Sequence, residues 1–570
     1  MAPALRLRLA GAGLDRPHDG LDGTVGVYRD HKDAGLAAVE NDGNSPFSRR
    51  DLLALIGTLA GSTAMYHAMT SLGFASDSAY QGPIKLAGDV RGASVLILGA
   101  GLAGMTAALE LRKAGYKVAV LEFNQRPGGR NWTLRGGDTF IELGGGKQSC
   151  EFEEGLYLNP GPWRIPYHHR ALLDYCKRLN VAIEPFVQLN HNALLHASGA
   201  FGGEPQRIRA IKADFQGEVS ELLAKATAQG RLDEEVSAQD KEMLLQALKS
   251  WGALDSNYAY KANLISADVR GYAKGPGGGL DGAPVAGEPI GLSEILKSRL
   301  WRYLQTFASH SFQTTMLQPV GGMDMIGKAF ARELGDVIRY DSKVIRIQQG
   351  GDGVTVSYVS ATKPEAVQVA KADWCVCTIP LSILSQIPID VGAPMKAAID
   401  AVPYLSAVKI GLQFKRRFWE DDEAIYGGIS YTDLPIRQIA YPNYGLNRGG
   451  RGVLLGAYIV EGANAYEFTS MTPAERVARA VALGARIHPQ YPAEFENGIA
   501  VAWHRVPSAL GCAGYWTEEA RAQHYNDLCQ IDGRIVLAGE HASYIPVWQE
   551  GAILSSLDAI TRLHERVVKT

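Results

Sequence analysis

One arginine, Arg164, stands in a setting suited to holding a substrate at a fixed angle. It lies in the stretch YLNPGPWRIPYHHR, residues 157–170, between Trp163 and Ile165 and among three prolines. A guanidinium is permanently charged and binds a carboxylate through two parallel hydrogen bonds. Prolines restrict the backbone around it, and the tryptophan limits access of water. These residue types fit an arginine that grips a planar anion, and they fit an ion pair with a structural acid equally well.

A second candidate site is a glycine-rich turn between a strand and a helix. The apolar stretch 93–98 predicts a buried parallel strand, GAGLAG follows it, and a helical stretch covers 105–114. In such a unit the first glycine permits a tight turn, the second lets the backbone approach a pyrophosphate, and the third lets helix and strand pack closely. We therefore predict a dinucleotide site at Gly99, Gly101, Leu102, Ala103 and Gly104.

Three further features refine this prediction. A strand over 117–121 ends in Glu122, which is placed to accept a hydrogen bond from a ribose hydroxyl. The loop RPGGR, residues 126–130, has two glycines and a guanidinium and favours FAD as the dinucleotide. Near the C-terminus a strand, GRIVLAGE, ends in Glu540, and residues 545–560 are predicted to be helical. This second strand and helix are expected to lie beside the phosphates or ribityl chain of the cofactor.

Taken in order, the motifs of this chain resemble those of the flavin amine oxidase family, and within it the L-amino acid oxidases of the bacterial, exported type. The resemblance covers about residues 90–565. Its motifs are VLILGAGLAGMTAALELRKAGYKVAVLE, RPGGR, GPWRIP, LQPVGGMD, AVKIGLQFKRRFWEDD, VLAGEHASY and VWQEGAI. It implies FAD as cofactor, with contacts from Glu122, Arg130, Gly161, Pro162, Trp163, Val344, Glu540, Val547, Trp548, Gln549 and Glu550.

The resemblance also implies roles around the substrate. Arg164 and Tyr458 match residues that touch the substrate carboxylate, Lys409 matches a lysine that holds a water near the flavin, and Trp548 matches an aromatic wall of the pocket. The sequence pattern alone favours other positions for two of these residues. Alternation in residues 407–414 predicts that Lys409 faces solvent, and Tyr458 lies in an apolar stretch where a tyrosine that packs in the core is expected. Val547 departs from the snake-venom members, which have glycine there, so side-chain specificity is open.

The implied reaction is oxidative deamination of an L-amino acid to a 2-oxo acid, ammonia and hydrogen peroxide, with dioxygen as acceptor. An amine or polyamine oxidase, or an amino-acid 2-monooxygenase, is the alternative of the same fold. A flavin-bearing binding protein or redox partner without turnover is the alternative from another class.

The expected fold is α/β. A Rossmann-type FAD-binding domain of the two-dinucleotide-binding, glutathione-reductase-like kind is predicted from residues 90–150, 317–380 and 500–565. Residues 151–316 are expected to form a mostly helical insert, and 381–499 a mixed-sheet substrate-binding domain. Residues 271–291 are rich in glycine and proline, which excludes a helix or a central strand and leaves a surface loop or a mobile lid.

Residues 1–80 are expected to be an N-terminal extension with an export signal. Twin arginines, Arg49 and Arg50, precede a modest apolar run, which is typical of the Tat route to the periplasm or the medium. That run is too short for a stable membrane span.

The composition of this 570-residue chain limits the kinds of binding partner that we expect. Its net charge of −3 gives no reason to expect nucleic acid as a partner. Neither the scattered cysteines nor the adjacent His168 and His169 have the spacing of a metal site. A homodimer is expected from the resemblance alone.

Overall fold

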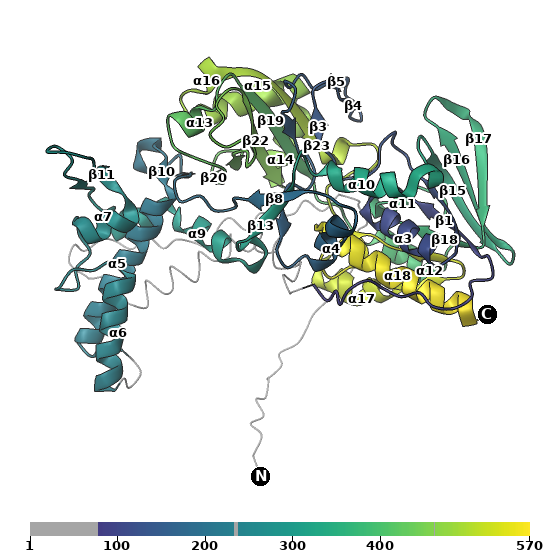
Figure 1. The fold of residues 1–570 in the computed structure, drawn as a ribbon, viewed down its shortest axis with the longest axis horizontal. Coiled ribbons are helices and arrows are strands. Elements are labelled where there is room, and N and C mark those ends of the chain that lie inside the picture. The colour runs from purple at the N-terminus through teal and green to yellow at the C-terminus, as the bar shows by residue number, and fades with distance from the viewer. Residues whose placement is uncertain (1–77, 233–236, 461, 570) are drawn as a thin grey trace, which may run out of the picture. The chain divides into compact units, whose positions relative to one another are not determined.

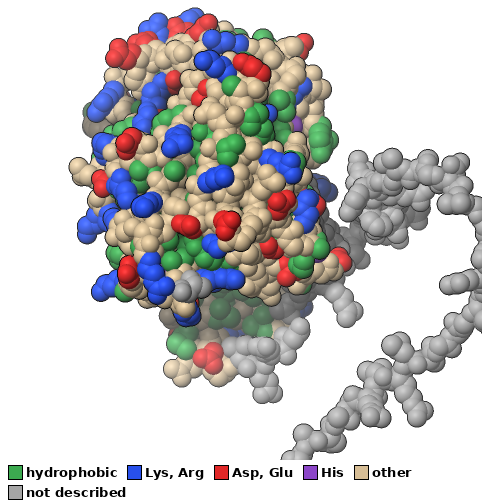
Figure 2. All heavy atoms as spheres, turned by 90° about the vertical axis from the view of Figure 1, so that its right-hand side faces the viewer, with side chains coloured by type: hydrophobic (Ala, Val, Ile, Leu, Met, Phe, Trp, Pro, Cys, Tyr) green, Lys and Arg blue, Asp and Glu red, His purple; other side chains and the backbone are tan. Residues whose placement is uncertain are grey.

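The computed structural model describes residues 78–232, 237–460 and 462–569. The predicted export signal lies outside these residues. Within them, no helix is long and apolar enough to cross a membrane. Figure 2 shows one face of the molecule, on which lysine and arginine side chains lie among acidic and apolar ones.

A six-stranded sheet forms the predicted dinucleotide-binding part. Its order is β14-β2-β1-β18-β25-β24, and all neighbours are parallel except the last pair. The strands come from three distant segments: β1 (Ser94–Leu98), β2 (Lys117–Leu121), β14 (Ile338–Arg339), β18 (Trp374–Cys377), β24 (Ile531–Asp532) and β25 (Ile535–Leu537). The central strand β1 is apolar because both its faces are covered.

Alternate residues of β1 pack into different cores. Val95 and Ile97 pack with α3 (Leu102–Lys113), α10 (Asp324–Leu334) and α18 (Gln549–Lys569). Leu96 and Leu98 pack on the other face with α12 (Ala393–Asp400) and an antiparallel sheet of β15 (Lys343–Gly350), β16 (Gly353–Ser360) and β17 (Lys363–Ala372). Figure 1 shows α3 and α18 near β1 and β18.

The second large sheet is mixed and has seven strands, in the order β10-β9-β20-β21-β22-β19-β23. Its strands are β9 (Leu194–His196), β10 (Gln206–Arg207), β19 (Ala407–Phe414), β20 (Ile429–Thr432), β21 (Gln438–Ala440), β22 (Gly452–Val460) and β23 (Phe495–Ala502). The sheet therefore extends beyond the predicted boundaries of 381–499. It takes β9 and β10 from the predicted insert because β9 pairs in parallel with β20, and β23 crosses residue 499.

The segment 151–316 combines helices with short strands. Its helices are α4 (Arg170–Arg178), α5 (Ile208–Ala228), α6 (Ala238–Trp251), α7 (Leu264–Arg270), α8 (Leu292–Ser298) and α9 (Trp301–Ala308), followed by a 3₁₀ turn, η3 (His310–Phe312). The glycine-rich stretch forms a hairpin of β11 (Tyr272–Lys274) and β12 (Val285–Ala286). Buried Asp214 holds both ends of this hairpin, accepting hydrogen bonds from Arg270 Nε at 2.7 Å and Ile290 N at 3.0 Å.

A small three-stranded sheet fixes the backbone beside Arg164. In it β13 (Met316–Pro319) lies between β7 (Ile165–Pro166) and β8 (Ile183–Phe186), and Leu317 pairs with Ile165. The arginine therefore immediately precedes a residue held in a strand ladder.

Candidate active site

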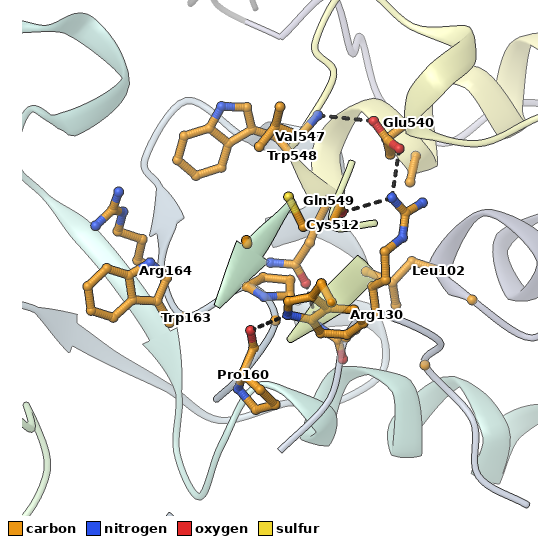
Figure 3. A pocket seen from close by; sticks show the side chains of 18 of the residues that line it. Leu102, Arg130, Pro160, Trp163, Arg164, Cys512, Glu540, Val547, Trp548 and Gln549 are labelled. Carbon is orange, nitrogen blue, oxygen red and sulfur yellow. Dashed lines mark hydrogen bonds and ion pairs between the residues drawn. The ribbon is translucent and has the colours of Figure 1, made fainter. Parts of the chain in front are cut away.

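A cavity of about 210 Å³ brings most of the predicted site residues together (Figure 3). The predicted residues that line it are Gly101, Leu102, Ala103, Arg130, Gly161, Pro162, Trp163, Arg164, Lys409, Tyr458, Glu540, Val547, Trp548 and Gln549. Five predicted residues do not line it: Gly99, Gly104, Glu122, Val344 and Glu550. Figure 3 shows Arg130 and Glu540 on one side of the cavity and Arg164 with Trp163 on the other.

The glycine-rich turn is shaped to admit a ligand at one glycine and to pack at another. A Cβ on Gly104 would lie 1.9 Å from the carbonyl oxygen of Gly99, so only glycine fits there. A Cβ on Gly101 would meet no atom within 4 Å, and Gly101 is the N-cap of α3. The free N–H groups of a helix N-terminus favour phosphate. The space above Gly101 therefore fits a pyrophosphate.

Asn131 gives a second sign of a ligand. Its Nδ2 donates to Gln549 Oε1 at 2.6 Å, and its buried Oδ1 has no partner among the described residues. A buried acceptor without a donor is costly, and Asn131 lines the cavity. Both observations fit a bound dinucleotide.

We expect Gly101→Val to lose FAD while the fold survives. The valine side chain would occupy the space above the turn, and valine is allowed at this backbone conformation, φ −74° and ψ 177°. Absorbance of the purified protein at the flavin bands, together with circular dichroism, measures both effects. Gly104→Ala is the comparison: it should unfold or fail to accumulate. A yellow Gly101→Val protein with full FAD content would contradict the assignment.

Glu122 holds the glycine-rich turn itself. Its buried carboxylate accepts hydrogen bonds from Ala100 N at 2.6 Å and from Asn124 N at 2.8 Å. Its predicted contact with a ribose hydroxyl remains a prediction, as does the adenine contact of Val344. Val344 lies in β15, packed in the core behind β1.

Arg130 and Glu540 form an ion pair at the edge of the cavity. Arg130 Nη1 lies 2.7 Å from Glu540 Oε1 and also donates to the Cys512 carbonyl at 3.0 Å. Burial alone would lower the pKa of Arg130, but the Glu540 carboxylate outweighs it and raises that pKa. For Glu540, burial would raise the pKa, and the charge of Arg130 lowers it on balance. Both groups are therefore charged.

Glu540→Gln is expected to lower the free energy of unfolding by about 3 kcal/mol at neutral pH, because it leaves a buried guanidinium without its counter-charge. The folded state lowers the pKa of Glu540 below its usual value of 4.5. The ionised Glu540 carboxylate therefore stabilises the fold above pH 4.5, and this contribution is lost as the pH falls through the lowered pKa of the folded state. The difference between the two proteins in urea unfolding should shrink below pH 4.5. A difference that stays constant with pH would contradict this.

The structure gives Glu550 a different role from the predicted cofactor contact. Its fully buried carboxylate accepts from Ala171 N at 2.9 Å and Leu172 N at 2.8 Å, in the first turn of α4, and from Ser78 Oγ. Glu550 therefore satisfies free N–H groups at a helix start. Its neighbours Trp548 and Gln549 line the cavity, as predicted. Glu550 is the second residue of α18, and its side chain turns away from the cavity.

Arg164 lies in the cavity under two aromatic rings. Its side chain is largely buried, 8% exposed. The guanidinium carbon is 4.7 Å from the ring centroid of Trp163 and 4.5 Å from that of Phe312. Arginine packs on ring faces in this way through the flat side of its guanidinium.

Lys409 is buried rather than solvent-facing. Its strand β19 lies between β22 and β23 in the sheet, all eight of its residues are buried, and Lys409 pairs directly with Tyr458. Its Nζ donates to the Gly161 carbonyl at 2.5 Å and lies 5.0 Å and 4.6 Å from the ring centroids of Trp163 and Tyr458. Burial, and then the charge of Arg164, hold the pKa of Lys409 well below its usual value. The alternation pattern predicted solvent exposure wrongly because both faces of this central strand are covered.

Aromatic side chains form the remaining walls. Trp163 meets Tyr458 edge-on with centroids 5.8 Å apart, and Trp548 meets His169 edge-on at 5.0 Å. Burial, and then His168, lower the pKa of His169 to about 3, so its imidazole is neutral. Trp548, predicted to form an aromatic wall of the pocket, therefore packs against the uncharged imidazole of His169.

Several lining residues were not predicted from the sequence. They are Gly128, Asn131, Pro160, Phe312, Thr378, Ala407, Gln438, Val460, Trp503, Cys512 and Gly539. Gly128, Pro160, Ala407 and Gly539 belong to the stretches quoted above and could have been found there. Trp503, whose Nε1 donates to the Pro160 carbonyl at 2.7 Å, and Phe312 lie outside every motif, and only the folded chain brings them in.

Comparison with known proteins gives the class of the molecule. Residues 102–563 match the family model of the flavin containing amine oxidoreductases, so the chain belongs to this family. YobN of Bacillus subtilis (strain 168), an L-amino-acid oxidase by name, is 28% identical over 475 residues, 81% of this chain and 93% of that protein. The L-amino-acid oxidase of Siganus canaliculatus is 26% identical over 488 residues, 83% of this chain and 86% of that protein.

Solved structures confirm the predicted fold class. Putrescine oxidase bound to putrescine superposes with a TM-score of 0.54 at 18% identity, covering 84% of this chain and 99% of that one. Cyclohexylamine oxidase from Brevibacterium oxydans IH-35A superposes with a TM-score of 0.53 at 17% identity, again over 84% of this chain and 99% of that one. The cofactor is FAD, as predicted, and Gly101, Asn131, Arg130 and Gln549 are residues that would hold it.

Proposed function

We propose that this protein is an L-amino-acid oxidase, which converts L-amino acids to 2-oxo acids with release of ammonia and hydrogen peroxide. The observation that carries the proposal is the buried guanidinium of Arg164 at the cavity wall, opposite the Arg130 side and close to Lys409. A guanidinium suits a carboxylate, which an amino acid has and a simple amine lacks. The names of the two relatives above agree with this substrate class.

The side chains of the cavity suit each requirement of that reaction. Arg164 binds the carboxylate and, with Tyr458, fixes the orientation of the substrate, which lowers the entropic part of the barrier. Trp163 and Trp548 exclude water. FAD, when bound, supplies the two-electron oxidant for the bond between Cα and hydrogen.

The charges of the cavity favour a neutral substrate amine. Arg164 supplies positive charge to the cavity, whereas Arg130 is paired with Glu540, the one carboxylate among the described residues that line it, and Lys409 has a strongly lowered pKa. Nearby positive charge disfavours an ammonium group. A Lys409 amine with a strongly lowered pKa holds a water or accepts a proton at Nζ. The amine nitrogen then has the lone pair that oxidation requires.

An amine oxidase is the second candidate, because the two solved structures are of enzymes named for amines. Against it stands the charge of Arg164, since a diamine such as putrescine would bring two cations and no carboxylate to the cavity that this guanidinium lines. The monooxygenase alternative differs only in the fate of oxygen.

A substrate survey separates these functions. The FAD-loaded protein is incubated with each of the twenty L-amino acids, with putrescine and with 2-phenylethylamine; peroxide is measured, and products are identified by mass spectrometry. We expect peroxide and 2-oxo acids from amino acids only. Turnover of the amines alone would refute the proposal, and an amide product would establish the monooxygenase.

We also propose export by the Tat route and a homodimer, on the basis of the twin arginines and the family resemblance respectively. Replacing both Arg49 and Arg50 with lysine should retain the protein in the cytoplasmic fraction. Unchanged export of that variant would refute the first proposal, and a monomer mass in sedimentation would refute the second.

A further inference from the structure

Two aromatic rings from distant parts of the chain meet at Arg164. Trp163 is its neighbour in sequence, whereas Phe312 belongs to η3 at the end of the helical segment. Phe312 is buried, lines the cavity and has its ring centroid 4.5 Å from the guanidinium carbon, closer than Trp163 at 4.7 Å. No sequence motif pointed to it.

A ring face over a guanidinium restricts how that cation can turn. Stacking uses the flat face of the group and leaves its five N–H donors at the edge for an anion. The attraction is stronger at a buried site than at an exposed one, because less water competes. A carboxylate that binds the edge through two hydrogen bonds must lie close to the same plane. The ring therefore influences the plane of a bound carboxylate through the guanidinium.

The backbone holds Phe312 and Arg164 in a fixed relation. Phe312 precedes β13 by four positions, and Arg164 immediately precedes β7. These two strands pair, with Met316 opposite Pro166 and Leu317 opposite Ile165. The Phe312 ring also packs with Phe186 and Met316, and it lies 6.2 Å from the ring of Trp548. Ring and cation thus each lie shortly before a strand of the same small sheet.

We propose that Phe312 is a positioning residue, which holds the plane of the Arg164 guanidinium and through it the orientation of a bound carboxylate. The inference rests on the proposed function in so far as that carboxylate belongs to the substrate. It assigns η3, which follows the last helix of the segment 151–316, a part in substrate alignment.

The test measures carboxylate binding without turnover. Benzoate is titrated into the FAD-loaded protein, and the change in flavin absorbance gives Kd; benzamide, of the same shape without the charge, is titrated in parallel. In Phe312→Leu we expect Kd for benzoate to rise about tenfold while Kd for benzamide stays within about twofold. Phe312→Tyr, which keeps the ring face, should bind benzoate like wild type.

A matched variant separates positioning from packing. Phe186 belongs to the same buried cluster and meets Trp163 edge-on at 5.6 Å, but its ring is not among those stacked on Arg164. Phe186→Leu should leave benzoate binding within about twofold of wild type. Phe312→Met is a second ring-free variant, in case Phe312→Leu does not fold.

Three results would overturn the inference: wild-type benzoate affinity in the ring-free variants, an equal loss in Phe186→Leu, or an equal loss for benzamide. The proposed function fails separately. A wild-type protein that shows this Phe312-dependent benzoate binding but oxidises no amino acid would refute the function and leave the positioning role standing.

Discussion

Replacing Arg164 with alanine is expected to lower kcat/KM for L-amino acids by roughly 30- to 5,000-fold, mainly through KM. Removing one partner of a buried, hydrogen-bonded charge pair costs about 2–5 kcal/mol, and every 1.4 kcal/mol is a factor of ten. FAD should remain bound, because Arg164 lies across the cavity from Arg130 and the glycine-rich turn. Steady-state peroxide release, with the flavin spectrum recorded on the same sample, measures both quantities.

Two comparisons make this result specific. Arg164→Lys keeps the charge but loses the two-pronged geometry, so it should recover only part of the lost binding. Arg451→Ala removes an arginine whose side chain is 46% exposed and should leave kinetics within about twofold of wild type. If Arg164→Ala oxidised amino acids at the wild-type KM, the carboxylate role and with it the proposed substrate class would be wrong.

The local elements of the dinucleotide unit were predictable because their signals are local. The apolar run of β1, the glycine spacing and the helical stretch after it lie within about one βαβ unit of sequence, and the structure has β1, α3 and β2 in that order. The alternating residues 407–414 were recognised for the same reason and correspond to β19.

The position of a side chain in the assembled sheet was not predictable from alternation. A lysine in a strand that is buried on both faces gives the same pattern as one on a half-exposed strand, so Lys409 needed either the family resemblance or the structure. The burial of all eight residues of β19 decides the matter, because it shows that both faces of the strand are covered. Glu550 shows the opposite case: its segment was correctly predicted to lie at the cavity, but the helical turn points its carboxylate at α4.

Phe312 could not have been found from the chain alone. It lies between an apolar helical stretch and a strand, where a phenylalanine is ordinary core material. What gives it a second role is the pairing of β13 with β7, two strands separated by about 150 residues of sequence. Long-range pairing of this kind has no signature in a single sequence.

Lys409→Met is expected to slow flavin reduction or reoxidation about 100-fold, within the range that general acid–base groups contribute. Methionine has nearly the length of lysine and no charge to desolvate, which offsets the loss of the hydrogen bond to the Gly161 carbonyl, so we expect the protein to fold. FAD content should also be unchanged. Anaerobic mixing with an amino acid and, separately, mixing of the reduced protein with dioxygen in a stopped-flow instrument resolve the two half-reactions.

The strand itself offers the matched control. Lys415 directly follows β19, is exposed, and donates to the Ala493 carbonyl at 2.7 Å outside the cavity. Lys415→Met should leave both half-reactions unchanged, so a slowing confined to Lys409→Met would reflect the amine buried beside Trp163 and Tyr458. The strongly lowered pKa of Lys409 adds a further expectation: a pH dependence of the affected step that disappears in the variant. Wild-type rates in both half-reactions would remove Lys409 from the chemistry and leave it a structural lysine that holds the Gly161 carbonyl.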